Sequence, residues 1–243
     1  MQTKMTDLVN KKILIIGGTS GFGLKTAELV SSLRAEVVLI GRDKTRLNDA
    51  IKKINNQNVT GEAFDATDTK QLNYFLSNHD KFDHIISMLG GAMGGGFIEA
   101  SFDEIHQAID DKFFANLKIA KSVWQHIAED GSLIFTSGSG GHPADASGAI
   151  IGNQAIETMV TGLAVELAPK IRVNAVSPTW TPTGLWRGLT DNDLQNNQAQ
   201  MVSQIPLKRV SKLDEVAQAY VFLMQNNFVT GQTIRVDGGI SVN

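Results

Sequence analysis

Short apolar runs rich in β-branched residues alternate with longer helical patterns along nearly the whole chain. This alternation predicts an α/β fold with a parallel β-sheet covered by helices on both faces, because each parallel connection needs a crossover. The predicted strands span residues 12–16, 36–40, 60–64, 84–88, 132–136, 172–176 and 233–236. The predicted helices span residues 21–33, 44–54, 70–77, 102–128, 148–168 and 213–225.

One segment, residues 179–206, interrupts this rhythm and is rich in Thr, Asn, Gln and Gly. Ligands of open α/β sheets bind beyond the carboxyl ends of the strands, so we predict that this irregular segment is a lid over a substrate. A solvated loop is the alternative. No repeat or linker divides the chain, and we predict one domain over residues 1–243.

Composition narrows the classes of partner. The chain has 22 Lys and Arg against 25 Asp and Glu, and its net charge of −3 gives no reason to expect nucleic acid. We expect a small-molecule substrate and copies of the same chain as partners. Because cysteine is absent, disulfides, thiolate metal sites and a cysteine nucleophile are excluded.

Targeting and metal signals are also missing. The first ten residues, MQTKMTDLVN, lack the apolar stretch of a signal peptide, and no apolar run is long enough to cross a membrane. We therefore expect a cytoplasmic protein with no membrane partner. Four histidines, at positions 79, 84, 106 and 126, show no ligand spacing, so we predict no metal site.

A glycine-rich turn follows the first predicted strand, in the sequence KILIIGGTSGFG at residues 12–23. Gly17, Gly21 and Gly23 permit a tight turn, close approach of a pyrophosphate, and close packing of helix on strand. The helix that follows offers free N–H groups to an anion. We predict a dinucleotide site that also includes Thr19, Ser20 and Phe22; a plain tight turn is the alternative.

The end of the second strand indicates which dinucleotide is bound. Gly41 and Arg42 leave room and positive charge for a 2′-phosphate, whereas a carboxylate there would favour a ribose 2′-hydroxyl. NADP(H) is therefore favoured over NAD(H), unless Arg42 is only a solvated residue. Asp65 and Ala66, after the third strand, are predicted to lie at the adenine, although Asp65 is also a common helix-start residue.

Two further stretches extend the pattern to the end of the chain: LAVELAPKIRVNAVSP at residues 163–178 and TGQTIRVDGG at residues 230–239. With the glycine turn, they make the chain resemble the short-chain dehydrogenase/reductase family over nearly its whole length. The resemblance implies one doubly wound, Rossmann-type domain with a seven-stranded parallel sheet, a nicotinamide cofactor, and a homodimer or homotetramer. It also implies cofactor contacts at Gly90, Pro178 and Thr183, where Thr183 matches a threonine that contacts the nicotinamide carboxamide.

The chain departs from this family at its catalytic residues. Common members use a tyrosine and, four residues later, a lysine; these positions hold Ala149 and Asn153 here. The only tyrosines, Tyr74 and Tyr220, lie on other predicted helices. At the usual serine position the chain has Gly138, so Ser137 and Ser139 are the neighbours that could take its role.

Lys112 stands where the family usually carries an asparagine linked to the catalytic lysine. Lysine and asparagine have therefore exchanged helices, and we hypothesise that Lys112 reaches the cavity beside Asn153 and restores positive charge near the nicotinamide ribose. The alternative is a surface lysine next to Asp110 and Asp111. A side chain pointing to solvent would end the hypothesis.

A proton donor is still needed for carbonyl reduction. We predict His142 for this role, because imidazole titrates near neutral pH and its loop should border the nicotinamide. Ser137 and Ser139 would orient a carbonyl or a relay water. The alternative is a loop histidine without a chemical role.

These residues support an NADP(H)-dependent oxidoreductase with a non-standard catalytic site, acting on a small, fairly apolar carbonyl or alcohol. Trp180, Leu185 and Trp186 would form an apolar wall in the lid. The alternative is a catalytically silent NADP(H) sensor or regulatory module, and a weaker one is non-redox chemistry on the same fold.

Overall fold

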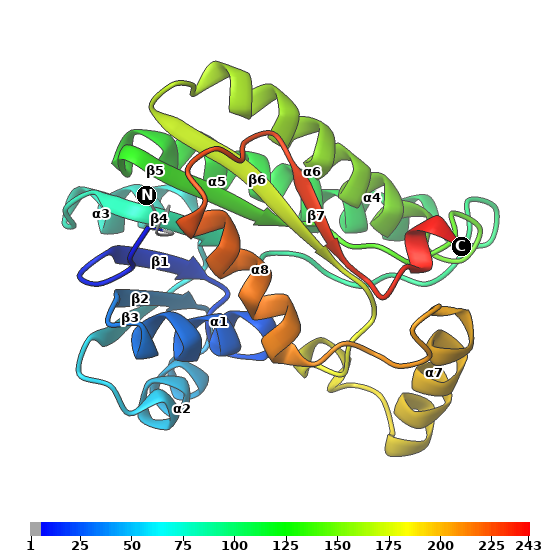
Figure 1. Ribbon diagram of the computed structural model, residues 1–243. Coiled ribbons are helices and arrows are strands. Elements are labelled where there is room, and N and C mark those ends of the chain that lie inside the picture. Colours follow the sequence, from blue (N-terminus) through cyan, green and yellow to red (C-terminus); the bar gives the residue numbers. More distant parts are fainter. Residues whose placement is uncertain (1–5) are drawn as a thin grey trace, which may run out of the picture.

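The computed structural model describes residues 6–243 and contains one seven-stranded sheet with the order β3-β2-β1-β4-β5-β6-β7. All six strand pairs are parallel, which confirms the predicted α/β fold (Figure 1). The strands are β1 (Lys12–Ile16), β2 (Glu36–Gly41), β3 (Val59–Ala63), β4 (Phe82–Ser87), β5 (Ile127–Thr136), β6 (Ile171–Pro178) and β7 (Thr233–Val236).

Helices cover both faces of the sheet, and the strands β1, β2, β4 and β6 are buried on both of their faces. In β1, Leu14 and Ile16 pack with α3 (Thr69–Ser77), α5 (Ala115–Val123) and α6 (Ser147–Glu166). Ile13 and Ile15 point the other way, into a second core. That core is formed with α1 (Gly21–Ser32), α2 (Lys44–Ile54) and α8 (Leu213–Gln225). Burying each Leu or Ile side chain fully stabilises the folded state by roughly 1.5–3 kcal/mol relative to leaving it exposed.

The helix predicted over residues 102–128 is interrupted. It consists of α4 (Phe102–Ile109), a π-helical turn η1 (Asp110–Phe114), α5 and a 3₁₀ turn η2 (Trp124–His126). The prediction of helix to residue 128 was wrong, because β5 already begins at Ile127. The buried Asn116 lies in α5, just after the π turn, and bonds to it. Its Nδ2 donates to the Lys112 carbonyl at 2.7 Å, and its Oδ1 accepts from Ser87 Oγ at 2.6 Å.

The segment at residues 179–206 is not the irregular insertion that we predicted. It contains the 3₁₀ turn η3 (Gly184–Trp186) and the 14-residue helix α7 (Asp191–Gln204), which stands beyond the strand ends (Figure 1). Thr190 caps α7 by accepting from Asp193 N, and acidic residues in the first turn favour the helix start. The helix was not predicted, because α7 buries no residue fully. Its Asn- and Gln-rich sequence therefore shows little apolar periodicity.

The parallel register gathers the connections that follow the strands at one edge of the sheet. Ile16, the last residue of β1, pairs with Ile40 in β2 and with Ser87 in β4. Thr136 at the end of β5 pairs with Val176 in β6. Residues separated by more than a hundred positions in the sequence therefore meet at this edge.

Two negative observations apply to residues 6–243. No helix in this range combines the length and the apolar character that a membrane span requires. No group of three or more His, Cys, Asp or Glu in this range is arranged to hold a metal ion. The first five residues of MQTKMTDLVN, discussed above, lie outside the described residues.

A buried histidine in β4 is expected to make the stability of the fold depend on pH. His84 is 3% exposed, and its Nδ1 lies 2.8 Å from Ser132 Oγ. Burial lowers the pKa of His84 from 6.5 to about 4. Between these values the unfolded chain binds more protons than the folded one, so stability present above pH 6.5 is lost as the pH falls. The full loss is about 3 kcal/mol.

Urea unfolding at pH 7.5 and pH 5 measures this effect. We expect His84→Gln to lose less stability between these pH values than the unmodified protein does. Equal losses in the two proteins would assign the pH dependence to other groups.

Candidate functional site

The glycine turn between β1 and α1 has the geometry of an anion cradle. Gly17 and Gly21 have φ angles of +88° and +54°, which favour glycine. A Cβ at Gly23 would lie 2.3 Å from the Gly17 carbonyl oxygen. Ser20 is the N-cap residue of α1, yet its side chain makes no capping hydrogen bond. The first N–H groups of α1 are therefore left without a side-chain cap, as phosphate binding requires.

Thr183 lies directly against this turn. A Cβ at Gly21 would be 3.2 Å from Thr183 Cβ, so the segment after β6 closes onto the start of α1. Thr183 is also the N-cap residue of η3, where its Oγ1 accepts from Leu185 N at 3.3 Å. Pro178, five residues earlier, is buried at the end of β6. The fold thus brings together the glycine turn and the threonine that the sequence predicted as cofactor contacts.

Thr19 packs closely against the end of β2. A Cβ at Gly41 would lie 2.4 Å from Thr19 Cγ2, so Thr19 fills the place where a carboxylate would stand. Arg42, the next residue, is exposed. Asp43 does not neutralise it, because this carboxylate caps α2 and pairs with Arg46 at 3.1 Å.

Asp65 lies after β3, as predicted, but its carboxylate closes a local turn. Its Oδ1 accepts from Thr67 N at 2.9 Å and from Thr67 Oγ1 at 2.8 Å. Asp68, not Asp65, is the N-cap residue of α3. Ala66 beside it is buried. The alternative reading of Asp65 as a helix-start residue was therefore wrong, because Asp68 already accepts from the first N–H groups of α3.

Lys112 in η1 points into the molecule. Its side chain is buried, and its Nζ donates to Asn153 Oδ1 on α6 at 3.0 Å. A Cβ at Gly90 would be 3.5 Å from the same Nζ. Lys112 does not point to solvent, which is the outcome that would have ended the exchange hypothesis.

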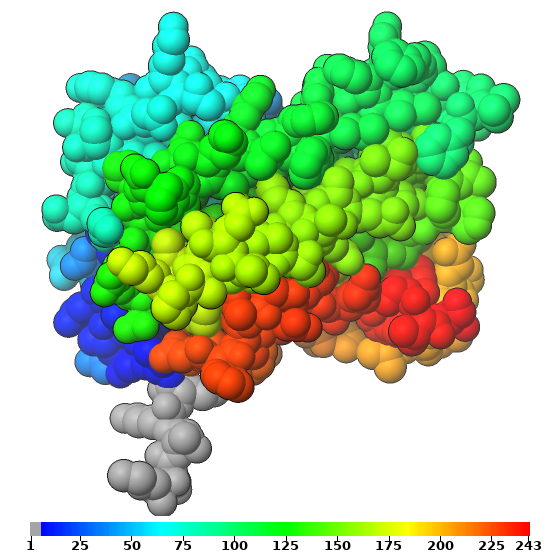
Figure 2. Space-filling view, turned by 90° about the horizontal axis from the view of Figure 1, so that it is seen from above, coloured from blue at the N-terminus to red at the C-terminus, as the bar shows by residue number. Residues whose placement is uncertain are grey.

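Close packing of η1 on α6 makes this contact possible. At Gly152, a Cβ would lie 2.8 Å from Lys112 Cβ, and at Gly148 it would lie 2.7 Å from the Ile105 carbonyl oxygen. These two glycines share one face of α6, because residues four apart are neighbours on a helix. Figure 2 shows α6 and the segment of α4, η1 and α5 running alongside each other over one face of the molecule.

The serine position is shaped by Asn153. A Cβ at Gly138 would lie 2.9 Å from Asn153 Nδ2, so the amide occupies space that a serine side chain would need. Neighbouring serines are bonded elsewhere: Ser137 Oγ donates to Glu157 Oε1 at 3.2 Å, and Ser139 Oγ donates to the Ser177 carbonyl at 3.2 Å. Gly138, Asn153 and Lys112 thus pack together as one group.

Neither tyrosine lies at Ala149, where the resemblance stated above implies one. Tyr220 on α8 is fully buried, and its hydroxyl bonds with Thr136 Oγ1 at 2.7 Å. Tyr74 on α3 is 75% exposed. Burial raises the pKa of Tyr220 above its ordinary value, which further disfavours proton transfer from its hydroxyl.

His142 lies in the loop between β5 and α6 and is exposed. Its Nδ1 accepts from Ala144 N at 3.1 Å, within its own turn. The histidine is thus on the predicted loop, while its ring is held by a local contact.

The segment after β6 carries paired aromatic residues. The rings of Trp180 and Trp186 are 5.7 Å apart between centroids, and Trp186 Nε1 donates to the Thr181 carbonyl at 3.0 Å. Leu185 is 52% exposed. The two tryptophans thus pack on each other, and Leu185 presents apolar surface close to Thr183 in the sequence.

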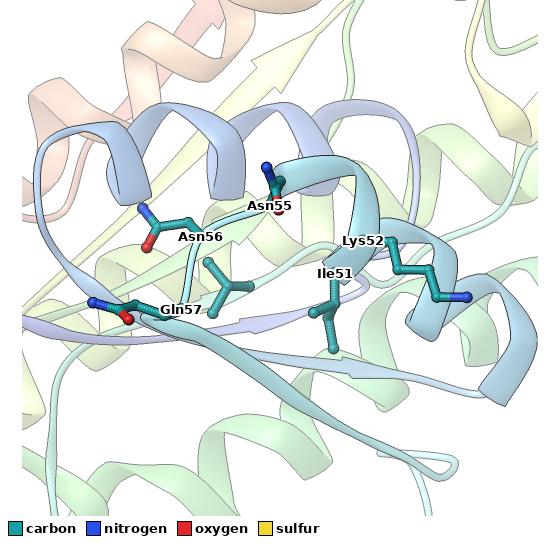
Figure 3. A pocket seen from close by; sticks show the side chains of 6 residues that line it. Ile51, Lys52, Asn55, Asn56 and Gln57 are labelled. Carbon is teal, nitrogen blue, oxygen red and sulfur yellow. The ribbon is translucent and has the colours of Figure 1, made fainter.

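A separate hollow lies away from the carboxyl ends of the strands. It is lined by Ile51, Lys52, Asn55, Asn56, Gln57 and Val59, where α2 ends and β3 begins (Figure 3). The amino end of β3 is opposite to the edge that holds the glycine turn. This hollow therefore takes no part in the candidate site.

Comparison with known proteins identifies the fold family. A family model described as enoyl-(acyl carrier protein) reductase matches residues 17–241. The chain belongs to the short-chain dehydrogenase/reductase family. This confirms the resemblance inferred from the sequence, and proteins of this family bind a nicotinamide cofactor.

Relatives of this dehydrogenase/reductase chain match it over nearly their full lengths. The short-chain dehydrogenase/reductase fsr5 of Gibberella fujikuroi is 29% identical and aligns with 97% of this chain and 96% of that protein. A glucose/ribitol dehydrogenase structure from Brucella melitensis has 25% identity and a TM-score of 0.86, and covers 98% of this chain and 99% of that one. A small-chain dehydrogenase in complex with NADPH has 28% identity and a TM-score of 0.79, covering 96% and 100%.

The described residues fit a nicotinamide dinucleotide. The uncapped start of α1 and the three glycines leave space and N–H donors for a pyrophosphate. Thr183 lies in the connection after β6, and Lys112 lies in the connection between β4 and β5. Burial lowers the pKa of Lys112 from 10.5 to about 8. The site of this dehydrogenase/reductase therefore combines an anion cradle with a desolvated amine.

Sequence reasoning missed several residues that build the site. Asn116 and Ser87 fix the Lys112 carbonyl, and Gly148 and Gly152 let η1 approach α6. Two glycines four residues apart in a predicted helix are a readable signal of close helix packing. The hydrogen bonds of Asn116 join segments distant in the sequence and left no such signal.

The packing at Gly23 gives a test of the anion cradle. We expect Gly23→Ala to displace the turn, since its new Cβ meets backbone atoms of Gly17 and Gly18. Loss of one charge-assisted hydrogen bond, worth roughly 1.5–3 kcal/mol, weakens binding by roughly tenfold or more. Fluorescence titration with NADPH measures this, with the melting temperature recorded in parallel.

Gly162→Ala is the matched control for this variant. Gly162 is exposed on α6, with its nearest neighbour atom 4.0 Å from the ideal Cβ position, and alanine there should stabilise the helix by up to about 1 kcal/mol. Its NADPH affinity should be unchanged. Equal affinities for Gly23→Ala and Gly162→Ala would contradict the assignment of the cradle.

Proposed function

We propose that this chain is an NADP(H)-dependent oxidoreductase that interconverts a carbonyl and an alcohol at a non-standard catalytic site. The observation that carries the proposal is the Lys112–Asn153 contact, which holds a buried cation at the edge of the sheet where the cofactor cradle lies. When bound, the reduced cofactor supplies the hydride for the carbonyl carbon. A binding module without chemistry has no evident need for a desolvated amine beside its ligand.

The preference for NADP(H) over NAD(H) rests on the end of β2. Thr19 packs against Gly41 and leaves no space for a carboxylate that would bind a ribose 2′-hydroxyl. Arg42 is exposed beside it and free to pair with a 2′-phosphate, which an arginine binds in a bidentate manner. The NADPH complex of a 28% identical relative agrees with this preference.

The remaining residues have assigned roles within this proposal. Gly17, Thr19, Ser20, Gly21, Phe22 and Gly23 surround the pyrophosphate, Asp65 and Ala66 border the adenine, and Gly90, Pro178 and Thr183 border the nicotinamide. Lys112 replaces the usual lysine from the opposite helix and Asn153 replaces the usual asparagine. We further propose that the functional unit is a homodimer or homotetramer, as is typical of the family.

The proposed substrate is small and fairly apolar. Trp180, Leu185 and Trp186 offer an apolar surface next to Thr183, where a substrate would meet the nicotinamide. Cofactor consumption against a panel of diketones, quinones and aldehydes tests the activity. NADPH binding without turnover of any of these compounds would favour the sensor function over the enzyme.

A substitution at Arg42 tests the cofactor preference. We expect Arg42→Met to weaken NADPH binding roughly tenfold or more, through loss of a charge-assisted contact, and to leave NADH binding unchanged. Fluorescence titrations with both nucleotides measure the two dissociation constants. Arg46→Met is the matched control, because Arg46 is exposed nearby but pairs with Asp43. Equal effects of Arg42→Met on NADPH and NADH would contradict 2′-phosphate recognition.

A further inference from the structure

The carbonyl oxygen needs one proton in this reaction, and the chain has no tyrosine at position 149 to give it. We propose that Lys112 Nζ is the proton donor, held in position by Asn153. This inference rests on the proposed oxidoreductase function and goes beyond the restored charge. It changes Lys112 from an electrostatic group into the acid of the reaction.

Geometry favours Lys112 over the other candidates. Lys112 Nζ is buried, its one hydrogen bond among the described residues goes to a neutral amide, and its other protons stay available for transfer. Asn153 lies one helical turn after Ala149 on the same face of α6, so the amine lies beside the position of the missing tyrosine. His142 is exposed and held in its own turn, while Ser137 donates to Glu157.

Among the described residues, no carboxylate on the elements around Lys112 forms an ion pair with it. In the adjoining turns, Asp110 lies 3.4 Å from His106, and Asp111 accepts from Gln107 at 2.8 Å. On α6, Glu157 binds Ser137 and Arg235. The other charged or titratable residues on α4, α5, α6 and the two adjoining loops are Glu99, Asp103, Glu104, Lys118, Lys121, Asp145, Glu166 and His142.

Burial alone accounts for the acidity of this amine. It lowers the pKa of Lys112 to about 8, and no charged neighbour contributes to the shift. At neutral pH the group is still mainly the ammonium form, yet it gives up its proton far more readily than an ordinary lysine. An acid with a pKa near the working pH is the most effective donor.

The proton transfer balances with the hydride step. As the carbonyl carbon receives the hydride, one N–H bond of the Lys112 ammonium breaks and one O–H bond forms at the carbonyl oxygen, which gives the alcohol. Lys112 is left as a neutral amine and recovers a proton from water. Because the ammonium is required, the rate of carbonyl reduction should fall as the pH rises through about 8.

Three changes at position 112 separate acid catalysis from charge alone. We expect kcat of Lys112→Met, measured at saturating NADPH, to fall roughly 10²-fold or more, the usual contribution of a general acid. Lys112→Arg retains the charge but cannot release a proton at these pH values, so it should also lose turnover. Because the chain has no cysteine, Lys112→Cys introduces a single thiol. Aminoethylation of that thiol rebuilds an amine that is a weaker base than lysine.

The aminoethylated protein should regain turnover, with the fall in rate moved to lower pH. Asn153→Asp tests the positioning role, because a carboxylate at this position raises the pKa of Lys112 and should move the fall in rate to higher pH. Lys118→Met, which removes an exposed lysine on α5, should keep the turnover of the unmodified protein. Melting temperatures of all variants check that each is folded.

The outcomes distinguish this inference from the proposed function. Turnover by Lys112→Met or Lys112→Arg near the unmodified rate would overturn Lys112 as donor and leave the oxidoreductase in place. Binding of NADPH without any turnover by the unmodified protein would overturn both. Titration of Lys112 by ¹³C NMR of labelled lysine, identified by its loss in Lys112→Met, is independent of activity. A pKa near the ordinary 10.4 would also overturn the inference.

Discussion

The close approach of η1 to α6 is the constraint on which the candidate site depends. Gly148 and Gly152 remove two side chains from one face of α6, and Lys112 packs its stem where Gly152 has no Cβ. A larger residue at Gly152 would meet Lys112 Cβ at 2.8 Å and push the two elements apart. The position of the ammonium is therefore set by backbone packing, and the hydrogen bond to Asn153 only completes it.

Lys112 brings a positive charge to α6 from a neighbouring element. Its Nζ extends from η1 and donates to Asn153 on α6. Gly138 belongs to the same arrangement, because its missing side chain leaves room for the Asn153 amide. Three positions on three segments of the chain therefore fit together, which supports the proposal of a non-standard catalytic site.

Much of the fold was predictable because local patterns determined it. β1, β7, α2 and α8 have the predicted bounds, since turn or capping residues flank a short apolar run or a helical pattern in each case. The π turn and α7 were not predictable in the same way. The π turn accompanies the long-range hydrogen bonds of Asn116, and α7 buries no residue fully, so neither has a strong local pattern. The Lys112–Asn153 pair was anticipated from two substitutions, but the supporting glycines were not.

We propose that Lys112 faces the nicotinamide of a bound NADP(H) while it remains bonded to Asn153. A crystal structure of the complex with NADPH is the decisive measurement. We expect it to place Lys112 Nζ within hydrogen-bond distance of both Asn153 Oδ1 and the nicotinamide half of the cofactor, with the 2′-phosphate on Arg42. A Lys112 side chain turned to solvent, with Asn153 bonded elsewhere, would contradict this proposal.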